Sequence, residues 1–82
     1  VVYVDLSMQE LVSQRTLGTL DESYRPKSQR AGDFIVSSDK NYIVNYVIQT
    51  DGKFNIMSIS DLGGTAISEL MNPVSGNFNY LI

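Results

Sequence analysis

The sequence contains no cysteine and no histidine among its 82 residues. Without cysteine the chain forms no disulfide, offers no thiol nucleophile and holds no cysteine-rich zinc site. Without histidine it lacks the commonest metal ligand and the commonest general base. We therefore expect a protein that is not an enzyme and that needs no metal or cofactor. The cellular compartment stays open, because a chain without cysteine suits oxidising and reducing compartments equally.

Positive charge is also scarce, since six Lys and Arg residues stand against nine Asp and Glu residues and give a formal net charge of -3. An acidic chain lacks the basic face that neutralises phosphates, so we expect no nucleic-acid binding. The apolar runs are far shorter than the roughly 20 residues of a membrane helix, so we expect no transmembrane segment. We predict one soluble domain over residues 1–82. Because the chain begins at Val1 and not at methionine, it can equally be a fragment or a processed piece of a longer protein.

Residues 33–60 carry most of the β-branched and aromatic side chains and predict a three-stranded antiparallel meander. Its first two strands are expected at Asp33–Ser37 and Tyr42–Ile48, and its third between residues 53 and 60. The rest of the chain is expected to pack around this meander.

Two turns set the expected register of the meander. The Asp51-Gly52 pair is typical of a two-residue type I′ hairpin turn, which would place Tyr46 opposite Met57. A two-residue turn at Asp39-Lys40 would place Ile35 opposite Val44. In these registers both faces of the meander are apolar, so we expect both to be covered.

Two short helices are predicted to provide that cover. Ser7 to Glu10 has the pattern of a capping box and predicts a helix that ends near Gly18. The apolar side of residues 66–71 predicts a second helix, which Asn72-Pro73 would end. With strands at Val1–Leu6 and Phe78–Ile82, the predicted fold class is α+β, in the order β-α-β-β-β-α-β.

One family resemblance rests on Gly32 to Ser38, Tyr42 to Val47 and Gly52 to Ile59, lying between the two predicted helices. This arrangement resembles the helix, three-strand meander and helix of SH2 domains over about half of the chain. That family carries its phosphotyrosine-binding arginine on the first meander strand, where this chain has Ser37. Phosphotyrosine binding is therefore not carried over, since no bidentate guanidinium is available there.

The polar segment from Thr19 to Gly32 has no helical or strand periodicity and predicts a long loop. Three cations of this loop fall within six consecutive residues. Together with a neighbouring tyrosine, they could bind an anion or an acidic partner. The candidate site residues are Tyr24, Arg25, Lys27 and Arg30. The alternative is a solvated loop with no ligand. The Gly63-Gly64 pair gives a weaker indication of anion binding. It precedes the predicted second helix, and the free amides at the start of that helix would face the anion.

The leading functional expectation is a non-enzymatic protein-interaction or assembly module, which binds a partner protein or another copy of itself. It would use a sheet edge, a terminal strand or the 19–32 loop. The alternative is a carrier or sensor of a small ligand, held in a pocket between sheet and helix beside Tyr46 and Met57.

Overall fold

The computed structural model describes residues 1–82 and is built almost entirely of β-strands. The elements in chain order are β1 (Val2–Met8), β2 (Leu11–Val12), β3 (Arg15–Thr19), the 3-10 helix η1 (Glu22–Tyr24), β4 (Arg30–Ser37), β5 (Asn41–Ile48), β6 (Lys53–Asp61), β7 (Ala66–Ile67), β8 (Glu69–Leu70) and β9 (Val74–Tyr80).

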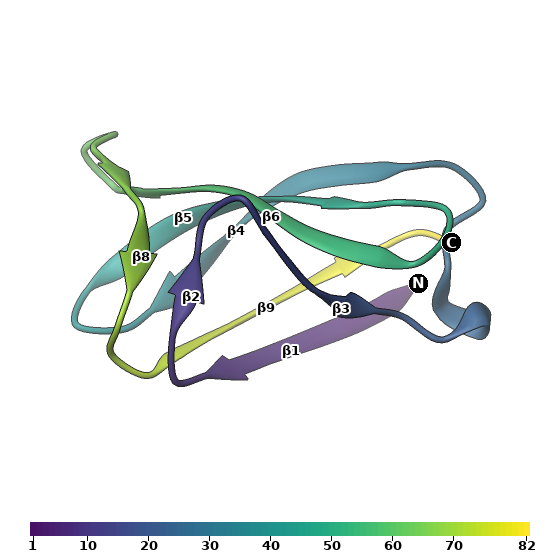
Figure 1. Ribbon diagram of the computed structural model, residues 1–82, viewed down its shortest axis with the longest axis horizontal. Coiled ribbons are helices and arrows are strands. Elements are labelled where there is room, and N and C mark those ends of the chain that lie inside the picture. The colour runs from purple at the N-terminus through teal and green to yellow at the C-terminus, as the bar shows by residue number, and fades with distance from the viewer.

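Six strands form one antiparallel sheet in the order β1-β9-β4-β5-β6-β3, and β7 adds to β6 beside this path. The sheet curls into a half-barrel, with β1 and β3 as its two outer strands. The β2–β8 pair forms a separate ribbon that crosses one end of the long strands (Figure 1). Both chain termini lie at the other end, near η1 (Figure 1).

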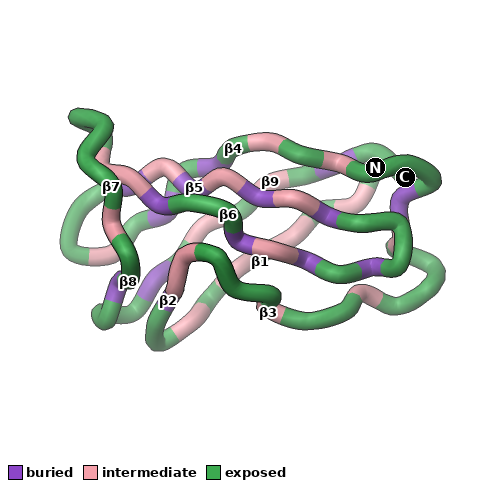
Figure 2. Tube along the Cα trace, turned by 45° about the horizontal axis from the view of Figure 1, so that its top comes forward, coloured by how far each residue is buried: buried purple, intermediate pink, exposed green.

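The hydrophobic core lies on the concave face of the half-barrel, where alternate residues of each long strand point inward. β5 shows the pattern most clearly, because Tyr42, Val44, Tyr46 and Ile48 are buried while the residues between them are not (Figure 2). The buried core residues are Leu11, Phe34, Val36, Tyr42, Val44, Tyr46, Ile48, Phe54, Ile56, Ile59, Leu70, Val74 and Tyr80.

An aromatic cluster joins β9 to the meander. β9 pairs with β4 at only two positions, Val36 with Gly76 and Ser37 with Ser75. Beyond them, Phe78 stacks on the meander with ring centroids 4.2 Å from Tyr46 and 4.7 Å from Phe34. Side chains, more than backbone hydrogen bonds, therefore hold the β1–β9 pair against the meander.

The predicted α+β fold class is wrong, because neither predicted helix forms. The segment expected to be helical from Ser7 to Gly18 instead completes β1, forms β2 and forms β3. The side chains of Val2 to Met8 alternate between partly buried and exposed, a period of two that extends the strand past the capping-box pattern. Leu11, expected on a helix face, is buried in β2 opposite Leu70.

The second predicted helix, at residues 66–71, is also replaced by strands. The chain turns back after Asp61, so that Ile67 of β7 pairs with Ile59 of β6, and β8 then pairs with β2. Six residues make a helix too short to be stable alone, and pairing with existing strands satisfies the backbone better. The likeness to SH2 domains ends here, because it depended on both helices.

The three-strand meander is present as predicted, but both of its turns contain three residues. In the second turn the amide of Gly52 donates to the carbonyl of Gln49 at 2.9 Å, and Gly52 has φ 91°. This is a type I turn followed by a left-handed glycine. The three-residue turn places Tyr46 opposite Ile56 and not Met57. A bulge between Asn45 and Tyr46 then shifts the pairing by one residue farther from the turn, where Val44 lies opposite Ile59.

The first turn changes which face each side chain occupies. Ser37 pairs with Asn41, and Ile35 lies opposite Ile43 and not Val44. A slip of one residue moves a strand's side chains to the opposite face. Phe34 and Val36 therefore join the concave core, while Ile35 and Met57 are 57% and 47% exposed on the convex face. The prediction that both faces are covered is wrong, because the apolar set belongs largely to one face.

Gly76 provides a test of how closely β9 approaches β4. A Cβ atom at residue 76 would lie 2.8 Å from the carbonyl oxygen of Ile35 and 2.9 Å from Cγ1 of Val36. The backbone oxygen cannot move away without breaking the sheet, so we expect Gly76→Ala to destabilise the fold by about 1–3 kcal/mol in urea unfolding.

The matched control is Gly18→Ala, since a Cβ atom there would meet nothing within 4 Å. We expect this control to change the free energy of unfolding by less than about 0.5 kcal/mol. Equal effects of the two substitutions would contradict the close approach of β9 to β4.

Candidate functional site

The outer edge of β1 is a free hydrogen-bonding edge of the sheet. β1 pairs with β9 over seven consecutive positions, from Val2 with Tyr80 to Met8 with Val74, and on its other side it pairs with nothing. It contains no proline, no lysine and no bulge, and of the common devices that protect edge strands it has only a single charge, at Asp5. Its free backbone groups are therefore available to another strand.

The opposite edge of the half-barrel, β3, is built differently. Its pairing with β6 shifts between Thr16 and Gly18, and it begins with the exposed cation Arg15. A bulge and a charge both oppose the addition of a further strand. Since β1 and β3 do not pair with each other, the half-barrel stays open along the line between them.

Two connected hollows, which we call together the β1 groove, follow this open line. One, of about 290 Å³, is lined mainly by Leu6, Met8, Leu17, Leu20 and Phe54. The other, of about 610 Å³, is lined by seven hydrophobic residues and by Asp5 and Ser23, the hydrophobic ones being Val1, Val2, Tyr3, Val4, Leu20, Tyr24 and Ile82. Leu20 lines both. The groove is therefore largely apolar and runs beside the free edge of β1.

η1 forms the wall of the groove at the end where the termini lie. The Tyr80 hydroxyl donates a hydrogen bond to the backbone oxygen of Tyr24, which ties η1 to the last strand. Tyr24 itself is half exposed and its side chain lines the groove. The carbonyl of Leu20 accepts a hydrogen bond from Arg25 Nε at 3.1 Å. These contacts give the irregular segment after β3 a defined position.

The residues predicted to bind an anion lie on this same segment. Arg25 is engaged with Leu20 and packs against Gly52, and Arg30 donates from Nε to the oxygen of Leu81 at 2.8 Å and from Nη1 to Ser28 Oγ at 2.7 Å. Lys27 is exposed, and Tyr24 lines the apolar groove. Two of the three cations thus hold the loop in place, and anion binding by this set stays a prediction.

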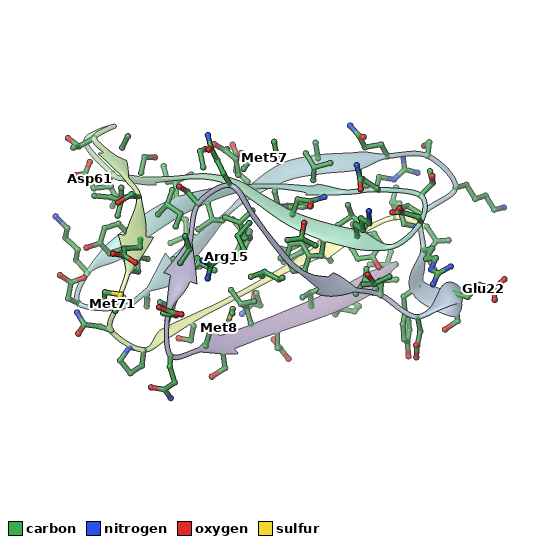
Figure 3. All side chains as sticks on the ribbon, viewed as in Figure 1. Met8, Arg15, Glu22, Met57, Asp61 and Met71 are labelled. Carbon is green, nitrogen blue, oxygen red and sulfur yellow. The ribbon has the colours of Figure 1, made fainter.

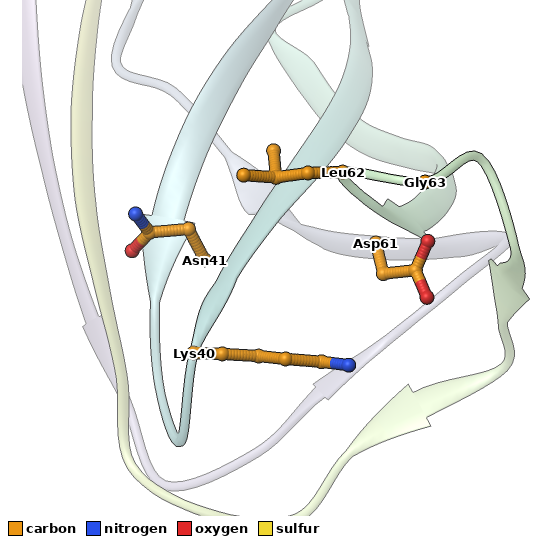
Figure 4. Close-up of a pocket in the computed structure, with 5 residues that line it drawn as sticks. All are labelled: Lys40, Asn41, Asp61, Leu62 and Gly63. Carbon is orange, nitrogen blue, oxygen red and sulfur yellow. The ribbon is translucent and has the colours of Figure 1, made fainter.

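The Gly63-Gly64 segment does not offer free amides at the start of a helix. Thr65 N donates to Asp61 Oδ1 at 2.9 Å and Gly64 N donates to the Asp61 carbonyl at 3.0 Å. Asp61 therefore already accepts the hydrogen bonds expected for an anion. Figure 4 shows the shallow hollow beside this turn, lined by Lys40, Asn41, Asp61, Leu62 and Gly63.

The shifted pKa values have local structural causes. The Tyr42 hydroxyl donates to Asp39 Oδ1 at 2.7 Å, which lowers the pKa of Asp39 and raises that of Tyr42. Burial raises the pKa of Tyr46 and of Tyr80. No group of three or more Asp and Glu residues is placed to hold a metal ion.

The pocket expected between sheet and helix has no helix to form its second wall. Tyr46 is buried in the aromatic cluster of the concave face, with Phe34, Phe54 and Phe78 around it. Met57 points away from that face (Figure 3). The two residues named for a ligand pocket therefore lie on opposite sides of the sheet, and ligand binding elsewhere stays untested.

Sequence reasoning missed the β1 groove because it treated residues 7–18 as a helix. A partial signal was present, since Val4, Leu6 and Met8 alternate with Asp5 and Ser7, while residues 1–4 are all apolar. Such alternation indicates a strand with one buried face. No comparable signal in the sequence shows that β1 would lie at an edge.

Comparison with known proteins found no matching family model, no matching curated protein and no matching solved structure. None of the structure's helical segments has the length and hydropathy to cross a membrane.

The bond from Tyr80 to η1 can be tested by Tyr80→Phe. Loss of the hydrogen bond to Tyr24 should cost about 1 kcal/mol at pH 7. Burial raises the pKa of Tyr80 in the folded state. Its stabilising contribution is therefore complete below the unfolded pKa of about 10 and is lost as the pH rises through the folded pKa.

Urea unfolding between pH 7 and pH 11 measures both effects. Above pH 10 the free energy of unfolding of the variant should fall less than that of the wild type. Part of the fall should remain in the variant, because the pKa of Tyr46 is also raised by burial. Tyr3→Phe serves as the control, because the Tyr3 side chain is 80% exposed. Tyr80→Phe curves that coincide with those of the wild type would contradict the assignment.

Proposed function

We propose that this chain is a protein-interaction module that binds an extended segment of a partner protein as an added strand on β1. The observation that carries the proposal is the combination of a regular, unpaired edge strand with a largely apolar groove along the same edge. Strand addition uses both features, since the backbone supplies affinity and the groove receives alternate side chains.

The dimensions suit an extended peptide. Seven residues of β-strand span about 20–24 Å, and an added strand of that length can pair along all of β1. Every second side chain of the added strand would point toward the concave side. There it would meet Leu6, Leu17 and Leu20, which are only partly buried in the free protein.

We further propose that the module is not an enzyme, on the basis of a sequence with neither cysteine nor histidine. The 19–32 loop takes part through Tyr24, which lines the groove, more than through its cations. Two of those cations donate hydrogen bonds to backbone carbonyls of the same molecule.

A phage-displayed library of random ten-residue peptides, selected on the purified protein, tests the proposal. We expect enriched peptides with alternating apolar residues, whose binding slows hydrogen exchange of the amides in Val2–Met8. Leu17→Lys places a charge in the groove and should weaken these peptides by about 10-fold or more, because burying an unpaired ammonium costs well over 1 kcal/mol.

Leu62→Lys is the matched control, since Leu62 is 61% exposed in the β6–β7 turn and lines no part of the groove. It should leave peptide binding unchanged. A library without enriched peptides, or peptides that protect another surface and bind Leu17→Lys normally, would overturn strand addition at β1.

A further inference from the structure

Asp5 is the only charged residue of β1 and stands at the centre of its seven residues. Asp5 is exposed, alternates with the partly buried Val4 and Leu6, and borders the larger hollow of the groove. It forms no ion pair, since the single ion pair of the structure joins Lys53 to Asp51. On the paired side its direct neighbour is Asn77 of β9, and the flanking residues there are Ser75 and Asn79. The Asp5 carboxylate therefore has no cation beside it on β9, the strand with which β1 is already paired.

We infer that the partner segment carries a Lys or Arg residue opposite Asp5, among alternating apolar residues that face the groove. This inference rests on the proposed function, because it names the chemistry of the segment that β1 would bind. A direct cross-strand pair of opposite charges stabilises an antiparallel sheet, and a pair of like charges destabilises it. Asp5 therefore selects among segments that fit the groove equally well.

The charges around the groove also favour a positively charged partner segment. No Lys or Arg lines either hollow. Asp21 directly follows Leu20, and Glu22 extends into solvent from η1 at the end of the molecule (Figure 3). Arg25 and Arg30 also lie near this end, on the carbonyls of Leu20 and Leu81. The net charge of -3 of the chain nevertheless favours a basic segment over an acidic one.

The same carboxylate argues against a second copy of this chain as the occupant. The antiparallel register that pairs all seven residues of β1 with β1 of another copy places Asp5 directly opposite its own counterpart. Like charges in directly opposed positions are destabilising. Any other register shortens the pairing, so a basic segment of a different protein is the better partner.

Three tethered strands test the inference on the full chain. Each follows Ile82 through a Gly/Ser linker of about 12 residues, whose mean span of roughly 17–21 Å lets the strand reach β1 at a high effective concentration. The neutral strand alternates valine with serine over seven residues. In the other two, the serines that face away from the groove are replaced by lysine or by glutamate.

Hydrogen exchange of the amides in Val2–Met8 reports how much of each strand is docked. We expect the lysine strand to dock with an equilibrium constant about 5-fold larger than that of the glutamate strand, a difference of about 1 kcal/mol. The difference should shrink in 1 M NaCl, where charges at an exposed site are screened within about 3 Å.

Charge reversal at the site should reverse the order. In Asp5→Lys the glutamate strand should dock better than the lysine strand. In Asp5→Asn the preference for the lysine strand should fall to the smaller difference that the remaining carboxylates produce. Glu69→Lys is the matched control, because it changes the net charge by the same amount on an exposed residue of β8 outside the groove. It should keep the order seen in the wild type.

The outcomes separate the inference from the proposed function. If the neutral strand docks but lysine and glutamate strands dock equally, the role of Asp5 is overturned and strand addition stands. If none of the three strands docks, strand addition is overturned and the inference with it. A dimer in sedimentation that protects Val2–Met8 without any added strand would make a second copy the occupant and would also overturn the inference.

Discussion

The stacking of Phe78 on the aromatic side chains of the meander is the contact on which the curled shape depends. β9 and β4 share only two paired positions, so the sheet is nearly divided into a two-stranded part and a four-stranded part. Phe78 lies 4.2 Å from Tyr46, 4.7 Å from Phe34 and 5.5 Å from Phe54, measured between ring centroids. Such aromatic pairs stabilise a fold beyond the area they bury. The position of β1, and therefore the groove beside it, follows from this cluster.

The meander could be predicted from sequence because its signal is local and dense. Tyr42 to Ile48 is rich in β-branched and aromatic residues, and turn-forming residues flank it on both sides. The turn lengths could not be read with the same certainty. Asp51-Gly52 is compatible with a two-residue or a three-residue turn, and only the hydrogen bond from Gly52 to Gln49 distinguishes them. In the other turn, between Ser37 and Asn41, one residue of difference in length decided which face Ile35 occupies.

The helices failed for a different reason. Apolar residues at Met8, Leu11 and Val12 satisfy a helical spacing and can equally belong to two separate strands, as they do here. Which arrangement forms is decided by distant partners, since Met8 pairs with Val74 and Leu11 with Leu70. Propensity and pattern over a short window contain no information about such partners. The candidate site was missed for the same reason, because an edge strand is defined by the neighbour that it lacks.

The pairing of β1 with β9 joins nearly the first residue of the sequence to nearly the last, with Val2 opposite Tyr80. Contacts between such distant parts of a chain close late, and folds rich in them fold slowly. During synthesis β1 emerges before the other strands of this sheet and has no partner strand until β9 has been made. For that whole interval both of its edges are unpaired, and its apolar side chains are uncovered, so it is the segment of this chain most exposed to misassembly before folding is complete.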